Sequence, residues 1–143
     1  MKRKILIVDD MESLLSLYKT QIRLKFPGVE VLTATNALDA LAQLSMEVDG
    51  DELIGVVSDY DMDLVNGFQF ARKVRKSFPL LPIFIHTQSA TDDLLALQEK
   101  CDSINVSVFS KKDSMKAYIL PWIEDELVRF VADKLVFVAT LIR

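Results

Sequence analysis

The stretch Ile5-Leu6-Ile7-Val8-Asp9-Asp10 decides the fold, because an apolar run leads directly into two acidic residues. A short, largely β-branched run of this kind is typical of a strand buried in a parallel sheet. Three further runs also lead into a polar residue: residues 53–58 before Asp59, 83–86 before Thr87, and 106–110 before Lys111. Since the carboxyl ends of parallel strands line the crevice where open α/β sheets bind ligands, we expect these side chains to meet at one edge.

Segments with helical periodicity alternate with the apolar runs. Apolar groups recur at helical spacing up to Pro27-Gly28, which stops that helix, and Asn36 is suited to cap a helix that reaches residue 44 or 46. A second strand is expected over residues 29–34, and further helices over 68–76, over 91–100, and from Asp113 or Ser114 onward. Five strands alternating with five helical segments predict an α/β three-layer sandwich around a parallel sheet.

Composition narrows the class of protein. The chain has 143 residues, 50% of them hydrophobic, and a net charge of -4, which suits one globular domain with a sizeable core and disfavours a nucleic-acid surface. The single Cys101 forms no internal disulfide, as in a reducing compartment. We find no apolar stretch long enough to span a bilayer and no secretory signal after Lys2-Arg3-Lys4. We therefore expect a cytoplasmic protein that contacts neither membrane nor nucleic acid through this chain.

Four features, in order along the chain, resemble the receiver domain of two-component response regulators. They are Asp9-Asp10 after the first strand, Ser58-Asp59-Tyr60-Asp61-Met62 followed by Gly67, the strand that ends in Thr87, and Phe109-Ser110-Lys111. The resemblance covers about residues 3–120. It implies a flavodoxin-like sandwich with strand order 2-1-3-4-5 as a receiver domain over residues 1–120, and a C-terminal helical extension over residues 121–143.

The resemblance also implies a magnesium site. Asp10 would be a direct ligand, Asp9 a weaker ligand or one that acts through water, and Asp59 would supply one carboxylate oxygen. The family also uses a backbone carbonyl two residues after the acceptor, which is that of Asp61 here. Hard oxygen donors are the ligands that Mg²⁺ prefers, and neighbouring carboxylates repel one another unless a cation compensates.

By the same resemblance, Asp59 would accept a phosphoryl group from a sensor histidine kinase or a phosphotransfer protein. Thr87 and Lys111 would contact the phosphoryl oxygens as the other catalytic residues. Such a domain catalyses only its own phosphotransfer and dephosphorylation, and it signals to a downstream protein, here unknown, through altered protein contacts.

Several positions depart from the family pattern. Asp63 replaces a common proline and is expected to face water, and Gln88 is large enough to narrow access to a phosphorylated site. Val108 stands where many receivers carry a switching aromatic residue, while its neighbour Phe109 is expected in the core. Lys112 replaces the proline that usually forms a cis bond. These departures leave open a degenerate receiver that acts as a phosphorylation-independent interaction scaffold.

Simpler interpretations exist for each residue alone. An acidic pair is common at a helix N-terminus, and strand-end hydroxyls and surface lysines are common everywhere. The sequence Asp59-Tyr60-Asp61 also resembles the motif of haloacid-dehalogenase-like phosphatases, but the chain offers neither their cap nor their downstream acidic loop. The joint occurrence of Asp9-Asp10, Asp59, Thr87 and Lys111 favours the receiver.

His86 is the only histidine, which excludes a site built from several histidines. Because its neighbour Thr87 is expected to face the crevice, strand alternation predicts that His86 points elsewhere and is a half-buried packing residue. Cys101 is expected to be a small apolar filler near a helix end.

The carboxyl end is unusually apolar. Pro121 is expected in the first turn of a new helix that follows a short one over residues 114–120. Apolar residues then recur on one helical face: Leu127, Phe130, Val131, Leu135, Val138 and Ile142. This helix either packs on its own domain, docks a partner, begins a linker or forms a homodimer, and we favour the homodimer.

Overall fold

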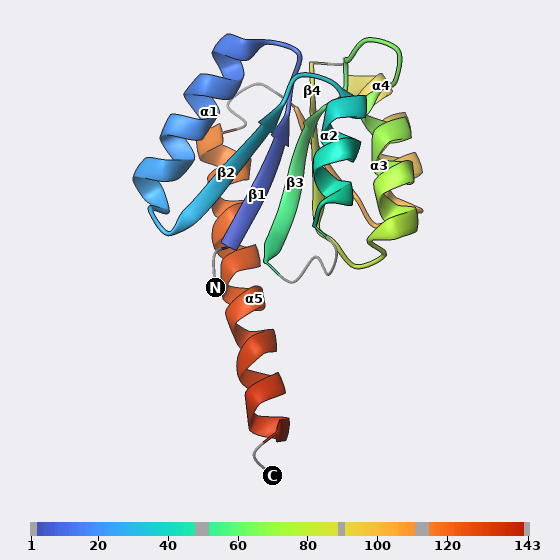
Figure 1. Cartoon of the computed structure of the whole chain (residues 1–143). Helices are drawn as coiled ribbons and strands as arrows, with labels where there is room; N and C mark the ends of the chain where they lie inside the picture. Colours follow the sequence, from blue (N-terminus) through green and yellow to red (C-terminus); the bar gives the residue numbers. More distant parts are fainter. Residues whose placement is uncertain (1–2, 48–51, 89–90, 111–114, 142–143) are drawn as a thin grey trace.

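The apolar runs form five strands that lie side by side in the computed structural model, which describes residues 3–47, 52–88, 91–110 and 115–141 (Figure 1). The strands are β1 (Arg3–Val8), β2 (Val29–Ala34), β3 (Leu53–Asp59), β4 (Ile83–Thr87) and β5 (Ser107–Ser110). All neighbouring strands are parallel and their order is β2-β1-β3-β4-β5. The flavodoxin-like sheet predicted from the sequence is therefore confirmed.

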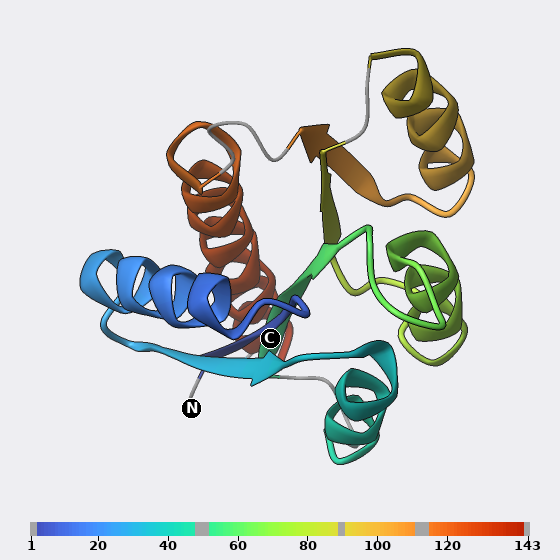
Figure 2. The ribbon, with the colours of Figure 1, turned by 90° about the horizontal axis from the view of Figure 1, so that it is seen from above.

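Helices cover both faces of this sheet. They are α1 (Glu12–Lys25), α2 (Ala37–Ser45), α3 (Gly67–Ser77), α4 (Thr91–Asp102), the π-helical turn η1 (Met115–Ile119) and α5 (Leu120–Leu141). Seen along the sheet, α1 and α5 lie on one face, and α2, α3 and α4 lie on the other (Figure 2). Each face has its own buried apolar cluster, because consecutive strand residues point in opposite directions.

The predicted helix signals are largely confirmed. The Asn36 side chain accepts a hydrogen bond from the backbone N–H of Asp39 at 2.7 Å, so Asn36 does cap α2. Asn66 and Gln69 form a reciprocal capping box that starts α3. Cys101 is fully buried near the end of α4, as expected of an apolar filler.

The start of the last helix differs from the expectation. A π-helical turn over Met115–Ile119 takes the place of the expected short helix and leads directly into α5. Ser114 lies outside the described residues. Pro121 is the second residue of α5, which confirms its predicted position in the first turn, where no intrahelical N–H is needed.

The first half of α5 belongs to the core, and its second half projects beyond the body of the domain (Figure 1). Ile119 and Ile123 are fully buried between the sheet and α1, and Trp122 packs on Gly55 of β3. Farther along, Val128 and Leu141 are 66% and 67% exposed.

Gly55 leaves the space that the Trp122 ring occupies. A Cβ atom at position 55 would lie 2.6 Å from the Cη2 atom of Trp122 and 3.1 Å from the carbonyl oxygen of Pro82. We predict that Gly55→Ala lowers the free energy of unfolding by roughly 1–3 kcal/mol through overpacking. Urea unfolding should show no such loss for Gly28→Ala, because no atom lies within 4 Å of a Cβ there. Equal stability of the two variants would contradict the proposed packing of α5.

Candidate functional site: an acidic cluster at the carboxyl edge

Three carboxylates meet where β1 and β3 end. Asp9 and Asp10 follow β1, Asp59 closes the neighbouring β3, and one oxygen atom from each lies within 4.8 Å of the others. Asp9 is 0% and Asp59 is 2% exposed, whereas Asp10 faces solvent. The structure thus brings together residues separated by about a third of the chain, as expected from the strand ends.

A cluster of this kind needs a positive charge nearby. Like charges repel at this range, and an ionised carboxylate without water around it is unfavourable unless it is paired. The three groups offer only oxygen donors, one of them open to solvent, and Mg²⁺ typically binds one or two carboxylates and keeps several water molecules. The donor set therefore fits a divalent cation, which Asp9, Asp10 and Asp59 would hold.

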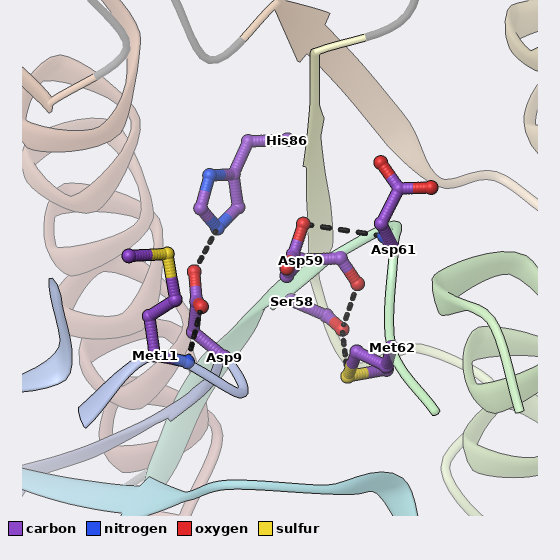
Figure 3. A network of polar contacts seen from close by, with 7 residues as sticks. All are labelled: Asp9, Met11, Ser58, Asp59, Asp61, Met62 and His86. Atoms are coloured by element: carbon purple, nitrogen blue, oxygen red, sulfur yellow. Dashed lines mark hydrogen bonds and ion pairs between the residues drawn. The ribbon is translucent and has the colours of Figure 1, made fainter. Parts of the chain in front are cut away.

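Hydrogen bonds fix the backbone around Asp59 (Figure 3). The Asp59 Oδ1 atom accepts the backbone N–H of Asp61 at 3.2 Å, and the Ser58 hydroxyl donates to the Asp59 carbonyl oxygen at 2.9 Å. The backbone N–H of Tyr60 donates to the His86 carbonyl oxygen at 3.0 Å, which extends the contact between β3 and β4 by one residue. The Asp59 carboxylate is thus held on a rigid support.

The position of Gly67 after Asp59 has a structural reason, because its backbone packs directly on the end of β3. Its N–H donates to the Tyr60 carbonyl oxygen at 2.8 Å, which folds the start of α3 back onto the end of β3. A Cβ atom at position 67 would lie 2.6 Å from the Asp59 carbonyl oxygen and 2.8 Å from the Tyr60 Cα atom. Only glycine fits against this backbone, so a side chain there would displace the strand end that carries Asp59.

Thr87 is fully buried at the end of β4, and its register partner in β5 is Ser110. Lys111 follows Ser110 in the sequence but lies outside the described residues, as does Lys112. The contacts of Thr87 and Lys111 with a phosphoryl group therefore stay predictions.

The other predicted residues near Asp59 are exposed. The side chains of Asp61, Asp63 and Gln88 face solvent, which confirms the expectation for Asp63. The Asp61 carboxylate does not belong to the three-carboxylate group, and the predicted role of its backbone carbonyl stays a prediction.

The aromatic residue of β5 lies one position beyond Val108. Val108 is buried, while the half-buried Phe109 ring stacks between Phe84 at 4.9 Å and Tyr118 at 4.6 Å, measured between ring centroids. This stack joins β4 and β5 to the π-helical turn that precedes α5.

The prediction that His86 is half-buried and points away from the site was wrong, although its ring does pack against Tyr18. His86 is fully buried, and its Nε2 atom lies 3.9 Å from Asp9 Oδ2 (Figure 3). Strand alternation correctly predicts that His86 and Thr87 point to opposite faces of β4. The acidic cluster, however, extends onto the face of the sheet to which His86 points. Asp59 and His86 are register partners and therefore share a face. No local sequence signal indicated this shared face, because it depends on the register between β3 and β4. None indicated either that the Met11 N–H donates to Asp9 Oδ1 at 2.9 Å.

Comparison with known proteins identifies the family of this chain. The profile of the response regulator receiver domain matches residues 5–114. The alkaline phosphatase synthesis transcriptional regulatory protein PhoP of Bacillus subtilis is 30% identical over 115 residues, which cover 79% of this chain and 45% of the relative. The chain thus spans less than half the length of that relative.

Solved structures share the fold. A chemotaxis response regulator, CheY4 of Vibrio cholerae, superposes with a TM-score of 0.63 at 22% identity and covers 91% of this chain and 99% of its own. A structure described as adenylate cyclase from Rhodopirellula baltica reaches 0.76 at 22% identity over 97% and 98% of the two chains. Within the described residues, no helix combines the length and apolarity needed to cross a membrane.

The profile match covers residues 5–114, which is more than half of the chain and includes all three carboxylates of the cluster. The chain belongs to the response regulator receiver domain family.

Proposed function

We propose that this receiver accepts a phosphoryl group on Asp59 in a Mg²⁺-dependent reaction. The observation that carries the proposal is the convergence of Asp9, Asp10 and Asp59 within 4.8 Å at the carboxyl edge of the sheet. Receiver domains are signalling domains and not turnover enzymes, so the expected product is the modified protein itself.

Each residue of the site has a proposed part in the phosphoryl transfer. One Asp59 oxygen forms a bond to phosphorus while the phosphorus–nitrogen bond of a phosphohistidine donor breaks, and the released imidazole takes up a proton. Bound Mg²⁺ would neutralise charge on the transferred group. Asp9, Asp10 and the Asp61 carbonyl would hold the cation, while the Thr87 hydroxyl and the Lys111 ammonium would contact phosphoryl oxygens. Such transfer requires mainly alignment, which a rigid strand end provides, and charge neutralisation, which the cation and Lys111 would provide.

The proposed partners follow from this chemistry. The donor would be a sensor histidine kinase or a phosphotransfer protein, and the signal would reach a downstream protein through altered contacts. The Bacillus relative is described as a transcriptional regulator, but the match covers 45% of that relative, and residues 5–114 of this chain fit the receiver profile. We therefore propose an output through protein contacts and no nucleic-acid contact within this chain.

Phosphorylation by a small phosphoryl donor tests the acceptor. In the presence of Mg²⁺, the wild-type protein should gain the mass of one phosphoryl group, and Asp59→Asn should gain none, because an amide cannot serve as the nucleophile. Asp63→Asn is the matched control, since Asp63 is an exposed acidic residue of the same loop, and it should be modified like the wild type. Modification of Asp59→Asn would place the acceptor elsewhere.

A degenerate receiver that acts only as a scaffold is the alternative, favoured by Gln88, Val108 and Lys112. Beryllofluoride with Mg²⁺, which mimics a phosphorylated carboxylate, separates the two. We expect the amide resonances of Asp59 and Thr87 to shift when beryllofluoride is added, and to return when Mg²⁺ is removed by a chelator. Unchanged spectra at saturating beryllofluoride would favour the scaffold.

We propose in addition that α5 forms a homodimer. Ile123, Leu127 and Phe130 pack on the domain, whereas Val128 and Val131, on another side of the same helix, are 66% and 39% exposed. In the sequence Leu135, Val138 and Ile142 follow these two at alternating spacings of four and three, as in a coiled-coil seam. Pairing with a second copy would bury such a stripe against itself.

Light scattering over a range of protein concentrations tests the dimer. The wild type should show a mass that rises toward twice that of the chain, whereas Val128→Glu combined with Val131→Glu should remain monomeric. Leu24→Glu is the control, because Leu24 is an 81% exposed apolar residue on α1, and it should dimerise normally. A wild type that stays monomeric, like a chain ended at Arg129, would refute the dimer.

A further inference from the structure

We propose that His86 is a positioning residue of the acidic site, which orients the Asp9 carboxylate for the cation. This inference rests on the Mg²⁺ site of the proposed function, and it adds a residue that the sequence pattern had assigned to packing. His86 contributes from β4, two strands away from the end of β1.

The side chain at position 86 must be long to reach Asp9. Strands in a sheet are about 4.8 Å apart, so β1 and β4, which flank β3, are separated by roughly 10 Å. The His86 imidazole bridges this gap, and its Nε2 atom lies 3.9 Å from Asp9 Oδ2 (Figure 3). A small aliphatic side chain at this position would not reach across β3.

The two oxygens of Asp9 face different neighbours. Oδ1 accepts the Met11 N–H at 2.9 Å, and Oδ2 faces the imidazole of His86. The distance of 3.9 Å is longer than a hydrogen bond, so a small rotation of either side chain is needed to form one. Contacts on both oxygens limit the rotation of the carboxylate about its χ2 bond.

His86 acts through Asp9 and not as a ligand of the cluster. Among the described residues, the group whose ligand atoms lie within 4.8 Å of one another contains the three carboxylates and not His86. The ring of Tyr18, on α1, contacts the imidazole edge-on, with ring centroids 5.7 Å apart and an interplanar angle of 70°. Tyr18 thereby fixes the ring that faces Asp9. Residues that orient a metal ligand without binding the metal commonly lower metal affinity 10- to 100-fold when they are removed.

Calorimetric titration with Mg²⁺ compares two substitutions of His86 in the full chain. His86→Leu fills similar space without an N–H and is expected to weaken Mg²⁺ binding by roughly tenfold or more. His86→Gln keeps a donor and should bind Mg²⁺ more tightly than His86→Leu. Ile85→Val is the control, because Ile85 is a buried neighbour on the opposite face of β4, and it should bind like the wild type.

A second measurement needs no substitution at position 86. His86 is the only histidine, so its imidazole nitrogen resonances are unambiguous. They should shift during the Mg²⁺ titration with the midpoint found by calorimetry, and the shift should shrink in Asp9→Asn. This readout shows whether the imidazole responds to the cation at Asp9, and it remains available if His86→Leu does not fold. The difference between His86→Gln and His86→Leu separates positioning from a purely structural role.

The results that would overturn the inference are distinct from a failure of the proposed function. Wild-type Mg²⁺ binding together with unshifted His86 resonances, unchanged affinity in His86→Leu, or equal losses in the Leu and Gln variants would each remove the positioning role alone. A wild type that binds no Mg²⁺ would remove the proposed cation site, and this inference with it.

Discussion

Mutual repulsion among Asp9, Asp10 and Asp59 is the constraint on which the rest of this structure depends. Two of these groups are buried and all three lie within 4.8 Å, so the fold itself must hold them together. The buried strands of a parallel sheet provide that support, because their apolar side chains stabilise both faces while their carboxyl ends converge. The stability of the packed sheet thus offsets the repulsion among the three carboxylates, and a cation at this site would reduce that repulsion.

Much of the fold could be predicted, because strand runs and helix caps are local in sequence. The strands, the cap at Asn36 and the edge where the polar residues meet follow from periodicity and from the rule for parallel strand ends. The acidic cluster itself was predictable for the same reason. Asp59 and Asp10 need no long-range information beyond the order of the strands.

The failure at His86 has a definite physical origin. Alternation assigns a side chain to one face of its own strand but does not say which neighbouring strand it can reach. Asp9 continues the face of Ile5 and Ile7, and His86 continues that of Phe84, so both belong to the layer covered by α1 and α5. The length of the imidazole follows from the residue itself, but the meeting also depends on the register between β3 and β4, which is not local in sequence.

The two supports of the site lie in different layers of the sandwich. Gly67, at the start of α3, packs on the backbone of Asp59 from one side of the sheet. His86 and Tyr18 approach Asp9 from the side covered by α1. If Asp9 and Asp59 share a cation, as proposed, its ligands are supported from both layers of the sandwich. The carboxyl edge of the sheet is therefore a place where residues supported by both layers of the sandwich meet.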